Sequence, residues 1–329
     1  MTAQRPGDET TGTTPAAHGC PIKVGLLLPV IEGTMAGDTA RWADLVAIAR
    51  RAEELGFDSL WVSDHLLFRL PGREERPVGM WEGWSLLAAL AASTSRIALG
   101  PFVSCTSFRN PALTAKMADT VDEISGGRLT LGLGAGSLPA EFAAYGYPAD
   151  HRVDRFEEAL TIIRGLLRDG QVDFVGRHYQ ARECELRPRG LRPGGPPILV
   201  GARSPRMDRL AARRADVWNA AWPNRAEALV PRLAAIDAAC QEVGRDPATL
   251  ERTVGVMVDL PGVGLSRDWL WAKIVREPLR PLTGSAGEIA AELQSCADLG
   301  VVHAQVWLAP PTVTGIEAFA PVLELLDRD

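Results

Sequence analysis

The chain has 329 residues, of which 46% are hydrophobic and 23% are charged, and its formal net charge is -6. This length is enough for one large core or two smaller ones. The net negative charge and the scattering of the basic residues give no reason to expect a nucleic acid or an acidic membrane as a partner. We therefore expect a small-molecule substrate, no nucleic acid and no membrane among its partners.

The five cysteines lie far apart and form no CxxC pair, so the sequence predicts neither a zinc site nor a disulfide framework. An odd number of scattered thiols is typical of a reducing compartment, and we expect a cytoplasmic location. No apolar run approaches the roughly 20 residues that a membrane-spanning helix needs. Residues 1–20 lack the basic and then apolar pattern of a signal peptide. We interpret residues 1–20 as a disordered tail and residues 21–329 as a single domain.

Apolar runs alternate with helical patterns along the rest of the chain. Strands are predicted at residues 23–29, 59–65, 96–105, 128–136, 197–202, 216–222, 253–260 and 302–309. Helices are predicted at residues 42–55, 81–92, 110–124, 151–167, 204–215, 225–243, 285–299 and 315–326. Two segments fall outside this alternation and are predicted insertions: residues 170–197, read as a hairpin, and residues 261–283, with a helical pattern at 267–276.

Strand–helix units that repeat without a shift in composition are typical of an α/β protein, and here they predict a closed (β/α)8 TIM barrel. The alternative is an open doubly wound sheet, which a dinucleotide-binding Gly-x-Gly-x-x-Gly motif would favour. Gly132, Gly134 and Gly136 lie towards the end of the strand predicted at 128–136, but no third glycine has the required spacing. The next helix is expected only at residue 151. The barrel is therefore the favoured fold.

Asp64 and His65 follow the apolar run that forms the second predicted strand. Chemistry in such barrels lies at the carboxyl ends of the strands. A histidine can accept or donate a proton at cellular pH, which suits an acid–base catalyst. The alternative is that Asp64 and His65 are a structural pair that closes the end of the strand.

Two further features have a functional and a structural interpretation. The glycines at 132, 134 and 136 leave room either for a ligand beside the backbone or for tight packing of the strand. Arg203 and Ser204 begin a predicted helix, where they form either a phosphate site or a plain helix cap with a solvated arginine.

Tryptophans are candidates for the walls of a substrate pocket. Trp81 and Trp84 either line this pocket or pack the second helix on the barrel. Trp269 and Trp271 lie in the insertion at 261–283, which we interpret as a lid and as the element that determines specificity. His178 and His303 are interpreted as structural, and no spacing of His, Asp and Glu predicts a metal site.

Several motifs together carry a resemblance to a known family. They are Ser-Leu-Trp-Val-Ser-Asp-His at 59–65, Ser-Arg-Ile-Ala-Leu-Gly at 95–100, Phe-Arg-Asn-Pro at 108–111, Ile-Ser-Gly-Gly-Arg at 124–128, Leu-Val-Gly-Ala at 199–202 and Ala-Asp-Val-Trp-Asn at 215–219. From residue 23 to residue 326 the chain resembles the bacterial luciferase-like monooxygenase superfamily. More narrowly, it is similar to the actinobacterial branch of coenzyme F420-dependent oxidoreductases.

The resemblance implies a barrel that holds a flavin or deazaflavin at the carboxyl ends of the strands, with a non-prolyl cis peptide near Phe102 and Val103. It implies that His65 exchanges a proton with the substrate while a hydride moves, and that Asp64 fixes the orientation of the ring or the imidazole. The cofactor contacts that it implies are Asp64, Phe102, Val103, Gly134, Ala135, Gly136, Ser137, Gly201, Ala202, Arg203 and Ser204.

The function that the resemblance implies is hydride transfer between coenzyme F420 and a small organic substrate. The alternative is an FMN-dependent, oxygen-using monooxygenase, and a non-catalytic binding barrel is a third hypothesis. Ser137 stands where the sugar-phosphate dehydrogenases of the family have a catalytic glutamate, which puts that substrate class in doubt. The family resemblance also implies a homodimer.

Overall fold

The computed structural model describes residues 22–35, 37–69, 77–223, 225–260, 262–263 and 281–327. Its main sheet is a ring of parallel strands in the order β5-β2-β1-β14-β12-β11-β10-β7-β6. These strands are β1 (Lys23–Leu27), β2 (Ser59–Val62), β5 (Ala98–Pro101), β6 (Ser104–Cys105), β7 (Leu131–Gly134), β10 (Ile198–Gly201), β11 (Val217–Ala221), β12 (Glu251–Asp259) and β14 (His303–Ala309).

Backbone hydrogen bonds bring the two ends of this sheet together. The amide of Leu99 donates to the carbonyl of Arg128 over 3.1 Å, and the amide of Thr130 donates to the carbonyl of Leu99 over 2.9 Å. These bonds join β5 to the start of β7, so the sheet curves into a nearly closed barrel. The predicted (β/α)8 barrel is confirmed, and the open doubly wound sheet is wrong.

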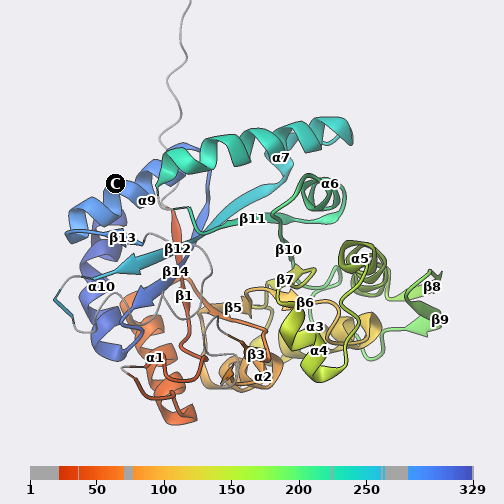
Figure 1. Ribbon diagram of the computed structural model, residues 1–329, viewed down its shortest axis with the longest axis horizontal. Coiled ribbons are helices and arrows are strands. Elements are labelled where there is room, and N and C mark those ends of the chain that lie inside the picture. Colours follow the sequence, from red (N-terminus) through yellow and green to blue (C-terminus); the bar gives the residue numbers. More distant parts are fainter. Residues whose placement is uncertain are drawn as a thin grey trace, which may run out of the picture.

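Helices surround the barrel, as Figure 1 shows. They are α1 (Trp42–Leu55), α2 (Gly83–Ser93), α3 (Pro111–Ser125), α4 (Pro139–Tyr145), α5 (Arg152–Asp169), α6 (Pro205–Arg214), α7 (Val230–Glu242), α9 (Ala286–Asp298) and α10 (Val313–Leu326), with short 3-10 turns at Ala226–Leu229 and Pro247–Thr249. None of the helices in the described part of the chain is long and apolar enough to cross a bilayer.

The prediction from the sequence misses one helix and joins two elements into another, both for local reasons. An additional helix, α4, lies between Gly136 and residue 151. Pro139 begins it, and Gly146 ends it in a left-handed conformation. The helix predicted at 225–243 is divided into a 3-10 turn and α7, and Pro231 lies in the first turn of α7. Of these two elements, α4 carries a residue that contacts His65.

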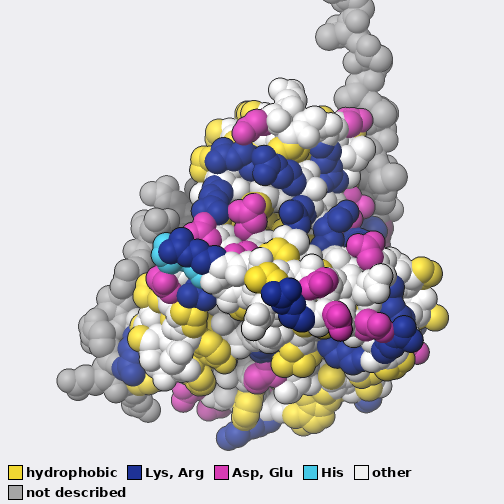
Figure 2. Space-filling view, turned by 90° about the vertical axis from the view of Figure 1, so that its right-hand side faces the viewer, with side chains coloured by type: hydrophobic (Ala, Val, Ile, Leu, Met, Phe, Trp, Pro, Cys, Tyr) yellow, Lys and Arg dark blue, Asp and Glu magenta, His cyan; other side chains and the backbone are white. Residues whose placement is uncertain are grey.

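The excursion at 170–197 contains the predicted hairpin, which is formed by β8 (Gln171–Val175) and β9 (Gln180–Glu185). It projects beyond α5 at the edge of the molecule (Figure 1). A second small hairpin, β3 (Leu67–Phe68) with β4 (Val78–Gly79), follows β2. On the side of the molecule shown in Figure 2, basic and acidic side chains are interspersed.

Much of the second insertion cannot be compared with its prediction. Residues 262–263 and 281–283 are described, and β13 (Leu282–Thr283) pairs with the end of β12. The helical pattern at 267–276 lies outside the described residues, as do Trp269 and Trp271.

The interior of the barrel is built around Trp61 of β2. A Cβ at Gly25 would lie 2.4 Å from Trp61 Nε1, and a Cβ at Gly100 would lie 2.7 Å from its ring, so only glycine on the two flanking strands leaves room for this indole. Trp61 Nε1 donates to Ser59 Oγ over 2.7 Å. Because the Ser59 oxygen accepts this bond, its hydroxyl is free to donate to His303 Nε2, 2.8 Å away.

We predict that His303 makes the protein less stable in acid. Burial lowers the pKa of His303 from its ordinary 6.5 to about 3. Between these pH values His303 binds a proton in the unfolded chain but not in the folded chain. The free energy of unfolding therefore falls as the pH falls from 6.5 towards 3. His303→Gln should therefore reduce the slope of the unfolding free energy against pH in this range, as measured by urea denaturation. An unchanged slope would contradict this.

Candidate functional site

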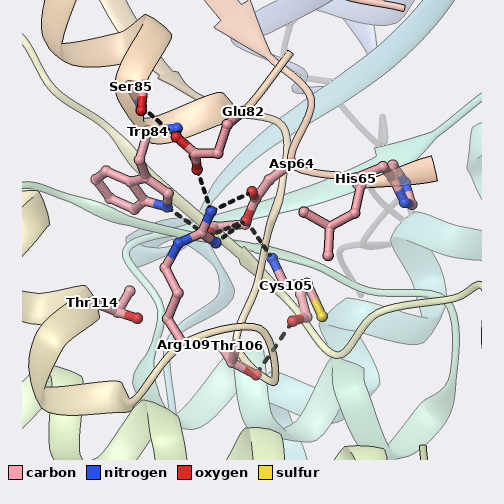
Figure 3. A network of polar contacts seen from close by, with 12 residues as sticks. Asp64, His65, Glu82, Trp84, Ser85, Cys105, Thr106, Arg109 and Thr114 are labelled. Atoms are coloured by element: carbon pink, nitrogen blue, oxygen red, sulfur yellow. Dashed lines mark hydrogen bonds and ion pairs between the residues drawn. The ribbon is translucent and has the colours of Figure 1, made fainter. Parts of the chain in front are cut away.

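Asp64 and His65 lie just beyond the carboxyl end of β2, after Ser63, and their side chains point to different surroundings. In Figure 3 the Asp64 carboxylate lies in the centre of a polar network, whereas His65 lies away from it. The Asp64 side chain is 1% exposed and the His65 side chain is 29% exposed. The two residues therefore perform different tasks.

Both carboxylate oxygens of Asp64 are occupied by protein donors. Arg109 donates from Nη1 to Oδ2 over 2.7 Å and from Nη2 to Oδ1 over 3.0 Å, which is a bidentate pair. The hydroxyl of Ser104 and the amide of Cys105 also donate to Oδ2, over 2.7 and 3.2 Å. Asp64 thus connects the end of β2 to β6 and to the loop before α3.

Arg109 extends the network to α2. Its Nη2 donates to Glu82 Oε1 over 2.5 Å. Glu82 is the N-cap of α2, where it accepts the amides of Trp84 and Ser85. Burial opposes the charge on Arg109, but Asp64 and Glu82 outweigh it and raise the pKa of the guanidinium. Arg109 therefore stays charged between two acidic groups.

His65 contacts a residue that the sequence did not single out. Its Nδ1 lies 2.9 Å from Oε1 of Glu141, a fully buried residue of α4. Glu141 Oε2 accepts the backbone amide of Leu66 over 3.0 Å. The ring of Phe68 lies 5.0 Å from the imidazole, centre to centre. Glu141 could not be predicted as a site residue from the sequence, because α4 was not predicted and the segment around Glu141 was expected to be a loop.

Packing beneath α4 holds Glu141 in place. Phe142 is fully buried, and its ring lies 5.1 Å from that of Phe108. Gly136 has a φ of +78°, and a Cβ there would lie 2.6 Å from Phe142 Cζ and 2.7 Å from Cys105 Sγ. Burial raises the pKa of the Cys105 thiol to about 12, so this residue acts as an apolar packing group.

The third barrel strand is interrupted between β5 and β6, where the peptide bond from Phe102 to Val103 is cis. The position predicted for a non-prolyl cis bond is confirmed. Val103 faces the glycines of the neighbouring strands: a Cβ at Gly134 would lie 2.6 Å from Val103 Cγ2, and a Cβ at Gly201 would lie 3.4 Å from it. At Gly134 the missing side chain makes room for this bulge, which is the packing interpretation of that glycine.

The start of α6 presents polar groups at the carboxyl end of β10. Ser204 is the N-cap and accepts the amide of Met207, and Pro205 follows. Arg203 is exposed, and it has no ion pair within the described ranges. Ala202 is buried. In the loop after β7, Ala135 is half-buried and Ser137 is exposed.

Aromatic side chains gather at the carboxyl ends of the strands. The ring of Trp222, which follows β11 directly, lies 5.9 Å from that of Phe102 and 5.8 Å from that of Trp307 in β14. Trp222 and Trp307 are not among the site residues predicted from the sequence. Their signal was an aromatic residue at or near the end of a predicted strand.

Of the two tryptophans predicted near α2, one packs inside and one is exposed. Trp84 is buried and its Nε1 donates to Ser104 Oγ over 3.1 Å, which agrees with the packing interpretation. Trp81 precedes α2, contrary to its predicted place in that helix. It is 41% exposed, and its Nε1 donates to the carbonyl of Ala40.

A cluster of possible metal ligands lies at the start of α5. One ligand atom from each of His151, Asp154 and His178 lies within 4.8 Å of the other two. Asp154 is already paired with His151 over 3.1 Å and with Arg206 over 2.5 Å. We therefore interpret these contacts as an ion-pair network between α5 and α6.

The chain matches the family model of luciferase-like monooxygenases over residues 22–260. An F420-dependent hydroxymycolic acid dehydrogenase of Mycobacterium tuberculosis is 34% identical over 243 residues, 73% of this chain and 63% of the relative. An F420-dependent glucose-6-phosphate dehydrogenase of Amycolatopsis mediterranei is 36% identical over 178 residues, 53% of this chain and 51% of the relative. The matched part of the chain thus spans between 51% and 63% of the length of these relatives.

Solved structures show the same fold at low sequence identity. An F420-dependent secondary alcohol dehydrogenase, in complex with an F420-acetone adduct, has a TM-score of 0.76 and 20% identity and covers 93% of this chain and 99% of its own. An EDTA monooxygenase from Chelativorans sp. BNC1 has a TM-score of 0.76 and 17% identity, with 94% of each chain covered.

The chain belongs to the luciferase-like monooxygenase family. The resemblance found in its motifs is confirmed. The homodimer, the cytoplasmic location and the roles of individual site residues stay predictions.

We predict that Arg109→Met lowers the free energy of unfolding by about 3–5 kcal/mol, because it leaves the buried Asp64 carboxylate without its cation. Asp64→Asn in the same chain should recover part of this loss. Arg51→Met is the control, since it removes an exposed pair with Glu54 and Glu317 and should change stability little. Urea denaturation measures all four proteins, and equal losses for the two single arginine variants would contradict the prediction.

Proposed function

We propose that the enzyme transfers a hydride between the deazaflavin coenzyme F420 and a small organic alcohol or ketone bound at the carboxyl ends of the strands. The observation that carries this proposal is His65, a partly exposed imidazole held by a buried carboxylate at the end of β2. The neighbouring strand ends in the cis bulge, and the amide of Phe102 donates to the carbonyl of Val62 over 2.8 Å. His65 and the bulge therefore belong to one part of the barrel rim.

The residues at the rim have the chemistry that such a cofactor requires. The α6 amides, the Ser204 hydroxyl and the Arg203 guanidinium are donors and a positive charge suited to a phosphate. Val103 of the bulge is half-exposed, and it would offer an apolar surface to a flat ring. Gly201, Ala202, Ala135, Gly136 and Ser137 line the adjacent strand ends, where their backbone would contact the cofactor.

When bound, the deazaflavin accepts or supplies the hydride. As the C–H hydride of an alcohol leaves, the hydroxyl proton passes to the ring of His65, and the carbonyl product forms. In the reverse direction His65 returns this proton to the carbonyl oxygen. Asp64, whose oxygens are occupied by Arg109, Ser104 and Cys105, would act indirectly by fixing the backbone from which His65 projects.

The relatives support this reaction class. The proteins named above as similar in sequence are F420-dependent dehydrogenases, and a phthiodiolone/phenolphthiodiolone dimycocerosates ketoreductase of Mycobacterium sp. is 32% identical over 231 residues. The group formed by Phe102, Trp222 and Trp307 favours a substrate with an apolar part.

We expect the purified protein to bind F420 in preference to FMN, because the relatives similar in sequence are F420-dependent, whereas a phosphate site at α6 and a bulge behind the ring would suit both cofactors. A fluorescence titration with both cofactors measures this. Arg203→Met should weaken F420 binding about tenfold through the loss of a charge-assisted hydrogen bond. Arg213→Met, at the other end of α6, is the matched control. Preference for FMN would favour the oxygen-using monooxygenase instead, and binding of neither would favour a non-catalytic barrel.

We expect His65→Ala to reduce turnover by about 100-fold to 10,000-fold, because proton transfer would lose its positioned group. Affinity for F420 should be retained, since His65 is not among the proposed phosphate and ring contacts. His178→Ala, in the turn of the β8–β9 hairpin, is the matched control and should keep full turnover. The readout is F420 absorbance during a screen of secondary alcohols and ketones. If His65→Ala keeps wild-type turnover, His65 is not the acid–base group.

A further inference from the structure

Glu141 is a fully buried carboxylate whose two oxygens contact two consecutive residues at the candidate catalytic position. Oε2 accepts the amide of Leu66 over 3.0 Å, and Oε1 lies 2.9 Å from Nδ1 of His65. The backbone amide of Leu66 can only donate. One oxygen of Glu141 is therefore committed to the backbone, and the other faces the imidazole.

This geometry determines which ring nitrogen carries the proton. A carboxylate only accepts hydrogen bonds, so the nitrogen of His65 that faces Glu141 must be a donor. Nδ1 then carries a hydrogen, and in the neutral ring Nε2 is left with its lone pair. An Nε2 lone pair is what the ring needs in order to take a proton from a hydroxyl group.

The support behind Glu141 is rigid. Glu141 lies in α4, and the next residue, Phe142, is packed against Phe108 beneath the turn at Gly136. Because Oε2 also accepts the Leu66 amide, moving the carboxylate away from the imidazole would break this partly buried hydrogen bond as well. The ring orientation therefore depends on the same side chain as the ring tautomer.

We propose that Glu141 is a positioning residue that holds His65 in the tautomer with the proton on Nδ1 and presents Nε2 to the substrate. This proposal rests on the proposed role of His65 in proton transfer. Its chemistry is that of an acid–base histidine oriented by a carboxylate, which here comes from a short helix after β7, far from His65 in the sequence.

The test is Glu141→Gln, which keeps the shape of the side chain and leaves one acceptor in place of two. The backbone amide of Leu66 still needs an acceptor, which is the side-chain carbonyl oxygen of the glutamine. The side-chain NH2 group of the glutamine then faces Nδ1 of His65 and donates to it. The ring proton is then forced onto Nε2. Nitrogen NMR of protein labelled at histidine, with His65→Gln to assign the signal, should show the protonated nitrogen change from Nδ1 to Nε2.

Turnover should fall with this change of tautomer, on the order of 100-fold, while F420 affinity stays constant. Glu53→Gln is the matched control. Glu53 also accepts backbone amides, those of Ser95, Arg96 and Ile97, but before β5, at the amino end of the strands. It should leave the His65 signal and turnover unchanged.

Two results would overturn the proposal: a wild-type His65 with its proton on Nε2, or a Glu141→Gln variant with unchanged tautomer and turnover. The protonated nitrogen of His65 in the wild-type protein is measured without any variant, so this result tests the proposal even if Glu141→Gln does not fold. Failure of the wild-type protein to bind F420 would overturn the proposed function alone, because the ring spectrum reports on Glu141 without any cofactor.

Discussion

The buried ion pair between Asp64 and Arg109 is the interaction on which the rim of the barrel depends. It joins the end of β2 to the loop before α3, and through Ser104, Cys105 and Glu82 it reaches β6 and α2. A pair of charges removed from water needs close geometry and full hydrogen bonding to be tolerated. Here each carboxylate oxygen of Asp64 accepts at least one hydrogen bond, so the ion pair fixes the end of β2 relative to the loop before α3.

This arrangement separates two neighbouring residues into a structural and a chemical task. Asp64 turns inward and is occupied by protein donors, whereas His65 remains partly exposed and contacts Glu141. Consecutive residues of an extended chain point to opposite sides, which allows one strand end to serve the core and the site together. The imidazole is thus placed from two directions, by the backbone fixed at Asp64 and by the carboxylate on α4.

Glycine has a related structural task at the rim. Gly134 and Gly201 face Val103, and Gly136 accommodates Phe142 and Cys105. These absent side chains let the cis bulge and α4 approach the barrel closely. The glycine-rich strand end therefore shapes the candidate site mainly through what it allows other residues to do.

The sequence by itself determined the barrel, because strand and helix periodicities repeat locally and each unit needs only its own residues to be recognised. It also determined that Asp64 and His65 lie at the carboxyl end of a strand, and the motif resemblance placed the cis bond near Phe102 and Val103. The tertiary structure alone decided that Arg109 pairs with Asp64, that Glu141 faces His65, and that Trp222 and Trp307 join Phe102. These contacts join residues that are distant in the chain, and only the closure of the barrel brings their strand ends to one rim.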